Sequence, residues 1–244
     1  IELRNEVALG EDFTLADLMD EYDAVFPGIG LGDANRLGVE NEDLDGVIDA
    51  VEYIATLRQT RDKGSLPVGN RVVVIGGGMT AIDIAVQSKR LGAACVDMYY
   101  RRGPEQMGAS GYEQQFAKTS GVSIHHWARP LRILGDKHAR GVEFERTALD
   151  AGGKLRSTGE TWSVDADVVF KAVGQQLGSG LPQSAGSALK MHDGKLSVSG
   201  DRRTSIEGVW AGGDCVAGGD DLTVTAVQDG KVAAHSIDRY LREQ

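Results

Sequence analysis

A glycine-rich turn carries the residues best suited to ligand chemistry. Gly76, Gly78 and Ala81 have the spacing G-x-G-x-x-A, directly after an apolar run at residues 72–75 and before a run of helix-forming residues. In that setting the glycines allow a tight turn and a close approach to a pyrophosphate, and the start of the helix offers unpaired N–H groups to an anion. The sequence therefore predicts a dinucleotide site, and a bare structural turn is the alternative.

Two arginines follow the next predicted strand. This strand spans residues 94–100 and ends in Arg101 and Arg102. Because the second strand of a dinucleotide-binding unit ends beside the adenosine ribose, an acid there favours NAD and an arginine favours the 2′-phosphate of NADP. Guanidinium groups bind phosphate in a charge-assisted, often bidentate way. We predict NADP recognition, and two arginines that solvate a strand end are the alternative.

A second glycine–acid group lies near the carboxyl end of the chain. Residues 208–215 read GVWAGGDC, and a helix is predicted from about Thr223. Asp214 beside a helix start suits a ligand with hydroxyl and phosphate groups, whereas a simple capped turn would use Asp214 to accept backbone N–H groups. The glycine-rich segment at residues 27–32 follows another short strand, and it either admits a ligand or only turns the chain.

The histidines and cysteines point to no metal site. His125 and His126 are adjacent on a predicted strand, so they face opposite sides and cannot chelate one ion together. Cys95 and Cys215 are far apart and form no C-x-x-C pair, which disfavours a redox dithiol of the thioredoxin-reductase kind. This cysteine usage is typical of a cytoplasmic protein without disulfides.

Composition narrows the classes of partner. The 244 residues carry a net charge of −10, which argues against general binding to nucleic acid or to an anionic membrane. No apolar run approaches the roughly 18 residues of a membrane-spanning helix. Hydrophobic residues make up 41% of the chain, enough for a sizeable core.

The order of predicted elements indicates an α/β protein. A short helix is expected at residues 14–19 and another helix at 47–60, followed by a linker at 61–70. Helix and strand follow again at 112–119 and 122–126, and alternating residues from 131 to 155 indicate an antiparallel meander before a strand that ends at Gly174. The final helix is expected to bury one face, made of Ala226, Ala233, Ile237 and Leu241.

Four ordered motifs together resemble the flavoproteins that bind two dinucleotides. They read VVVIGGGMTAIDIA, VDMYYRRGPEQM, ADVVFKAVGQ and GVWAGGDCVAGG with the helix after it. Within this family the chain is most similar to the small chain of glutamate synthase and to the NAD(P)H/FAD part of dihydropyrimidine dehydrogenase. The resemblance implies a Rossmann-like NAD(P)H-binding domain at residues 66–174, with a parallel sheet and an antiparallel meander. It would be inserted into a partial FAD-binding domain at residues 1–65 and 175–244.

The same resemblance implies cofactors, partners and site residues. NADPH, or NADH, would pass a hydride to FAD, and electrons would continue to an iron–sulfur subunit or domain; no catalytic side chain is expected. The family's first glycine turn would precede residue 1, so a fragment is expected, and Gly108 stands where the family usually has proline. Two alternatives are an NADP-binding module without redox activity and a structural subunit that keeps the fold. The implied dinucleotide-binding residues are Gly76, Gly77, Gly78, Met79, Thr80, Ala81, Arg101, Arg102 and Gly174, and the implied flavin-binding residues are Gly30, Gly213, Asp214, Thr223 and Val224.

Overall fold

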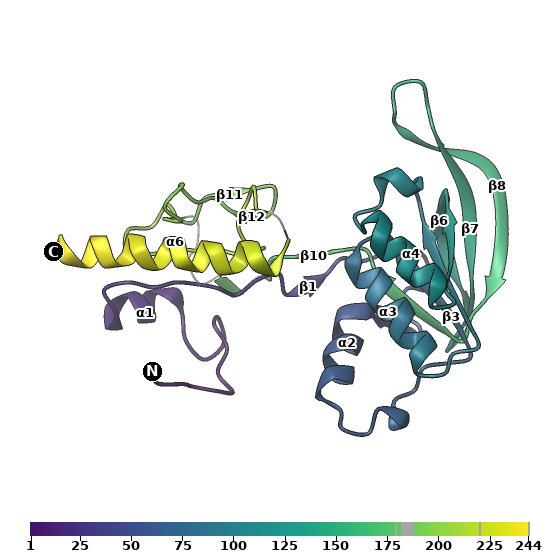
Figure 1. Cartoon of the computed structure of the whole chain (residues 1–244), viewed down its shortest axis with the longest axis horizontal. Coiled ribbons are helices and arrows are strands. Elements are labelled where there is room, and N and C mark those ends of the chain that lie inside the picture. The colour runs from purple at the N-terminus through teal and green to yellow at the C-terminus, as the bar shows by residue number, and fades with distance from the viewer. Residues whose placement is uncertain (179, 182–187, 220, 244) are drawn as a thin grey trace. The chain divides into compact units, whose positions relative to one another are not determined.

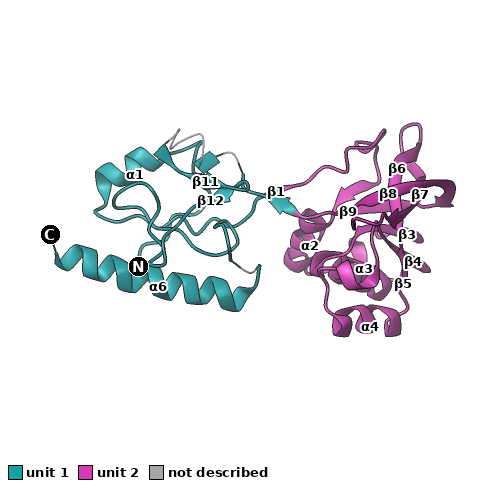
Figure 2. Cartoon of the chain, turned by 90° about the horizontal axis from the view of Figure 1, so that it is seen from above, with its two compact units in different colours: residues 1–33, 175–244 teal, residues 34–174 magenta. Residues whose placement is uncertain are grey.

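The chain divides into two compact units. A computed structural model describes residues 1–178, 180–181, 188–219 and 221–243. Unit 1 comprises residues 1–33 and 175–244, and unit 2 comprises residues 34–174 (Figure 2). Unit 2 thus begins well before residue 66, where the sequence analysis put the boundary, because residues 47–59 pair and pack with the elements that follow them. The assignment of a cofactor to each unit stays a prediction.

A five-stranded parallel sheet forms the centre of unit 2. Its strand order is β2-β9-β3-β4-β5, and all four pairings are parallel. The apolar run of β3 is buried on both faces, as the continuous β-branched sequence predicts. The bounds are β2 Val47–Asp49, β3 Arg71–Gly76, β4 Cys95–Tyr100, β5 Ser123–His126 and β9 Val168–Ala172.

Three helices cover one face of this sheet (Figure 1). They are α2 (Ala50–Gln59), α3 (Met79–Arg90) and α4 (Gly111–Thr119), and short 3₁₀ turns lie at Lys63–Ser65 and Pro104–Gln106. Val72 and Val74 of β3 pack against these helices in one core cluster. The helix expected from residue 47 begins at Ala50 instead, because Asp49 accepts the N–H groups of Val51 and Glu52 and so caps it.

An antiparallel sheet packs on the other face. Strands β6 (Ala128–Gly135), β7 (Ala139–Leu149) and β8 (Leu155–Asp165) form the expected meander in sequence order, and Figure 1 shows their long hairpin. Val73 and Ile75 of β3 join Phe144 of β7 in the core between the two sheets. The alternation along β3 therefore places helices on one side and the meander on the other.

Unit 1 has its own, smaller core around Leu15, Val209 and Leu196. In the described part of this unit, the helices with known bounds are α1 (Leu15–Glu21) and α6 (Thr223–Arg242). Short strands β11 (Met191–His192) and β12 (Lys195–Leu196) pair within this unit. Strand β1 (Asp33–Ala34), which crosses the boundary between the units, pairs with β10 (Gln175–Gln176).

The buried face of α6 differs from the expected one. Only Ala233 of the four expected residues is buried, and Asp229 and Ser236 are buried with it. Both polar side chains have partners: Asp229 accepts the N–H of Gly213, and Ser236 accepts the indole N–H of Trp210. Apolar periodicity could not reveal this face, since polar residues occupy it.

Candidate functional site: a dinucleotide turn and an arginine pair

The three glycines of the turn differ in the space that surrounds them. Gly76 has φ +154°, and an added Cβ would overlap the carbonyl oxygen of Ala172 on the neighbouring strand. A Cβ on Gly77 would overlap the ring of Tyr100, whereas one on Gly78 would meet no atom within 4 Å. The first two positions thus require glycine for packing, and the third presents bare backbone to open space.

The start of α3 is suited to an anion. Gly78 is its N-cap, and no side chain caps it. Its first turn contains no acidic residue, whereas the first turns of α1, α2 and α4 contain Asp17, Glu52 and Glu113. Since the first N–H groups of a helix lack intrahelical partners and carry positive partial charge, this is the helix start in unit 2 that best fits a phosphate.

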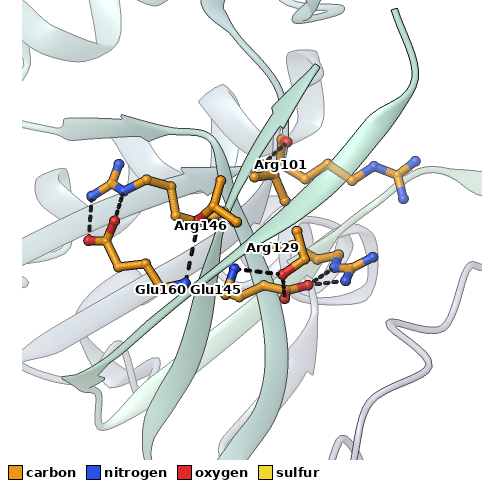
Figure 3. Close-up of polar contacts among 9 residues, drawn as sticks. Arg101, Arg129, Glu145, Arg146 and Glu160 are labelled. Atoms are coloured by element: carbon orange, nitrogen blue, oxygen red, sulfur yellow. Dashed lines mark hydrogen bonds and ion pairs between the residues drawn. The ribbon is translucent and has the colours of Figure 1, made fainter. Parts of the chain in front are cut away.

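Arg101 and Arg102 are both exposed at the end of β4. Among the described residues neither guanidinium takes part in an ion pair, whereas the nearby Arg146 pairs with Glu160 at 2.7 Å and Arg129 pairs with Glu145. Figure 3 shows these two pairs and the Arg101 side chain extending without a partner. Two unpaired arginines on an acidic protein leave positive charge available for a phosphate.

Parallel pairing brings these features to one edge of the sheet. Gly76 pairs in register with Ala172, and Ile75 pairs with Tyr99 just before the arginines. Gly174 follows β9 with φ +93°, and its carbonyl accepts the N–H of Asn35 at 3.0 Å. The predicted dinucleotide-binding residues therefore gather at the carboxyl edge, where α/β sheets bind ligands. Of these residues Ala81 is fully buried against the sheet, while Met79 is 42% exposed.

The loop with Gly108 in place of proline closes over the glycine turn. The N–H of Ala109 donates to the carbonyl of Gly77 at 3.0 Å, and the Tyr100 hydroxyl donates to the carbonyl of Gln106 at 2.6 Å. A Cβ on Gly108 would lie 3.7 Å from the Cα of Gly78. This loop is thus anchored to the turn without a proline.

Three predicted flavin-binding residues meet in unit 1. A Cβ on Gly30, at φ +64°, would lie 3.1 Å from Oδ1 of Asp214, so the two glycine-rich turns lie side by side. Gly213 has φ +85°, and a Cβ there would lie 3.6 Å from the Cβ of Ala226, in the first turn of α6. Thr223 and Val224 are exposed at the start of α6, which has no side-chain cap and no acid in its first turn.

Two residues that the sequence analysis missed hold this turn. Asp229 is 1% exposed; one carboxylate oxygen accepts the N–H of Gly213 at 3.0 Å, and the other pairs with Arg202 at 2.6 Å. The carbonyl of Arg202 accepts the N–H of Ala211 at 3.0 Å. The only local sign of this role in the sequence was Asp229 itself, an acidic residue on the face of α6 that was expected to be buried.

His125 and His126 contact neighbouring side chains, and Cys215, next to Asp214, donates its thiol to the carbonyl of Gly212 at 3.2 Å. His125 forms an ion pair with Asp97 at 2.9 Å and stacks on Tyr99, while His126 lies 3.4 Å from the Met107 sulfur. Burial lowers the pKa of His126. Cys95 is exposed and Cys215 is buried, and burial raises the pKa of the Cys215 thiol. Within the described residues no group of three or more metal-binding side chains occurs.

Comparison with known proteins identifies the family. Residues 5–230 match the family model described as pyridine nucleotide-disulphide oxidoreductase. This chain belongs to that family. The sequence-based resemblance to flavoproteins that bind two dinucleotides, the Rossmann-like α/β fold class and the cofactors NADPH and FAD are thereby confirmed at the level of the family.

Two curated relatives and one solved structure show which members of the family the chain resembles. The chain is 37% identical to the "Glutamate synthase [NADPH] small chain" of Escherichia coli, over 99% of this chain and 55% of the relative. It is 34% identical to the "NADP(+)-dependent formate dehydrogenase subunit beta" of Moorella thermoacetica, over 96% of this chain and 34% of the relative. The thioredoxin reductase of T. acidophilum superposes with a TM-score of 0.68 at 26% identity, over 88% of this chain and 64% of that one.

The chain thus spans about half, or less, of the curated relatives it matches. By sequence it belongs to the pyridine nucleotide-disulphide oxidoreductase family, with glutamate synthase small chains among its homologues. No helix in the described part of the chain is long and apolar enough to cross a membrane.

Proposed function

We propose that unit 2 binds NADPH at the carboxyl edge of its parallel sheet. The observation that carries this proposal is that the start of α3 has no side-chain cap and no acid, while two arginines without ion-pair partners among the described residues end the neighbouring strand β4. The backbone at Gly77 and Gly78 would hold the pyrophosphate, and Arg101 with Arg102 would hold the 2′-phosphate. A carboxylate at the end of β4 would instead have supported NADH.

The flavin is assigned to unit 1. Gly30, Gly213 and Asp214 lie together there, and the uncapped start of α6 follows them. Asp214 would accept hydrogen bonds from ribityl hydroxyls, and the N–H groups near Thr223 and Val224 would face a polar atom of the ring. Asp229 and Arg202 act on this turn by fixing its backbone.

The reaction is hydride transfer without an acid–base side chain. When bound, NADPH would supply a hydride to FAD, and the electrons would then pass to an iron–sulfur partner or domain. The chain's own residues bind and orient the two dinucleotides, which is the usual contribution of protein to such chemistry. Similarity to chains named "Glutamate synthase [NADPH] small chain" supports NADPH as the nucleotide, whereas the likeness to dihydropyrimidine dehydrogenase and a cytoplasmic location stay predictions.

One titration tests the proposal. The chain is titrated calorimetrically with NADPH and separately with FAD, and NADPH oxidation is followed with ferricyanide as acceptor. NADPH binding with flavin-dependent turnover is the expected result. NADPH binding without FAD binding would favour the second candidate, an NADP-binding module without redox activity of its own, and binding of neither would overturn both.

A further inference from the structure

Trp127 occupies the single position between two sheets. It follows β5, the edge strand of the parallel sheet, and precedes β6 of the meander. Its N–H donates to the carbonyl of Arg102 at 3.1 Å, and its own carbonyl accepts the N–H of Thr147 at 2.9 Å. Trp127 is therefore bonded directly to the arginine pair through the backbone.

The backbone of Trp127 is held in an uncommon conformation. Its φ is +61°, and a bulky residue with positive φ is a genuine outlier that persists only where the surroundings enforce it. The enforcing contacts come from Thr147, which is buried in β7 and also donates its hydroxyl to the carbonyl of Arg101 at 2.7 Å. Trp127 and Thr147 together fix the carbonyls of both arginines.

The indole ring lies against the turn that follows the arginines. A Cβ on Gly103 would lie 2.7 Å from ring atom Cζ2 of Trp127, so the ring rests on bare glycine backbone. Trp162 stacks with Phe144, Trp210 packs edge-on against Tyr240, and an arginine lies over the ring of each tryptophan. Trp127 has neither kind of partner among the described residues, and it belongs to neither core cluster of unit 2. A half-buried aromatic ring without a stacking partner thus stands beside the proposed phosphate site.

In NADP the adenine and the 2′-phosphate are attached to the same ribose. The adenine must therefore lie next to whatever holds that phosphate. Trp127 is the aromatic residue whose backbone N–H donates to the carbonyl of Arg102. Flat purine rings stack on tryptophan, and such stacking contributes appreciably to affinity. We propose that the Trp127 indole is the platform for the adenine ring of NADP. This inference rests on the proposed function and assigns its adenine-binding residue.

Two variants of the full chain distinguish the effect of the Trp127 ring from that of its backbone conformation. Trp127→Asn removes the ring but tolerates positive φ, whereas Trp127→Phe keeps an aromatic face. The probes are adenosine 2′,5′-bisphosphate and reduced nicotinamide mononucleotide, which has no adenine. We expect Trp127→Asn to weaken binding of the bisphosphate about tenfold or more, Trp127→Phe to restore most of it, and the mononucleotide to bind all three chains alike. Wild-type affinity for the bisphosphate in Trp127→Asn would overturn the inference.

Tryptophan fluorescence supplies a second readout. Stacking of adenine should quench the emission of Trp127, so the bisphosphate should quench the unaltered chain and the matched control Trp162→Phe equally. In Trp127→Phe the quenching should disappear, and quenching that persists there would contradict the platform. If the unaltered chain fails to bind the bisphosphate and NADPH, the proposed function fails as well; if it binds both and Trp127→Asn binds them equally, only this inference fails.

Discussion

At the scale of single residues, neighbouring glycines of the turn have separable roles. Gly77→Ala would push the Tyr100 ring aside, so we expect it to cost about 1–3 kcal/mol of folding free energy and to abolish NADPH binding. Gly78→Ala has open space and a φ of −96°, so it should fold normally and lose only NADPH affinity, because its methyl group would project beside the start of α3. Thermal denaturation and NADPH titration of both variants check this. Normal NADPH affinity in Gly78→Ala would contradict the placement of the pyrophosphate.

Arg101 should decide between the two nicotinamide cofactors. Its guanidinium has no partner within the described chain, so Arg101→Glu removes charge available for a phosphate and adds repulsion. We expect NADPH affinity to fall at least about tenfold while NADH affinity stays close to wild type, because charge-assisted hydrogen bonds contribute about 1.5–3 kcal/mol. Arg146→Gln is the matched control, since Arg146 already pairs with Glu160. Equal loss of both cofactors would exclude recognition of the 2′-phosphate by Arg101.

His126 should make stability depend on pH. Burial lowers its pKa in the folded protein, and the nearby Lys118 acts in the same direction while Glu105 opposes it. Below pH 6.5 the unfolded chain therefore binds the proton more readily than the folded one, and stability falls as the pH drops from 6.5 through the folded pKa. In His126→Gln this part of the pH dependence should vanish, as measured by melting temperatures between pH 5 and 8. An unchanged difference between pH 5 and 8 in the variant would contradict this role.

At the scale of elements, the buried carboxylate of Asp229 connects α6 to the turn at Gly213 and to Arg202. Asp229→Ala would leave Arg202 and the N–H of Gly213 without this acceptor. Breaking a buried ion pair costs about 3–5 kcal/mol, and we expect about 3 because Arg202 is partly exposed. Denaturant unfolding of Asp229→Ala, Arg202→Ala and the double variant would measure the coupling. Additive losses would show that the pair does not act as a unit.

Local sequence determined the elements around the glycine turn well. Strand β3 and helix α3 lie where the apolar run and the helix-forming run predict them, because both signals are contained in one short stretch. Residues 47–49 were expected in a helix but form β2, because they pair with β9, more than a hundred residues later. The role of Asp229 was missed because its partners Gly213 and Arg202 lie outside its own helix, where helical periodicity gives no signal.

The same distinction applies to the candidate site. The spacing of Gly76 and Gly78 and the position of Arg101 could be read directly from the sequence, because each follows a strand whose carboxyl end is recognisable. The contributions of Trp127 and Thr147 could not, because they depend on a positive φ and on hydrogen bonds between two different sheets. Residues that position a site from another element leave no periodic signal.

At the scale of the whole molecule, each unit contains a core of its own. The two core clusters of unit 2 lie within residues 34–174, and the third cluster lies within unit 1. Tyr53 of α2 packs on Phe170 of β9 with ring centroids 4.9 Å apart, so the segment before residue 66 belongs structurally to unit 2. A boundary at residue 65 would remove β2 from the sheet edge and expose this contact.

We therefore expect residues 34–174 to fold alone and to bind NADPH as tightly as the full chain. All the proposed NADP-binding residues, together with Trp127 and Thr147, lie in this segment. A fragment of residues 66–174 is the matched comparison; it should melt less cooperatively, because Phe170 and the exposed edge of β9 lose the cover of α2 and β2. Calorimetric melting and NADPH titration of both fragments would decide this. If the longer fragment failed to bind NADPH while the full chain bound it, residues outside 34–174 would have to contribute to the site.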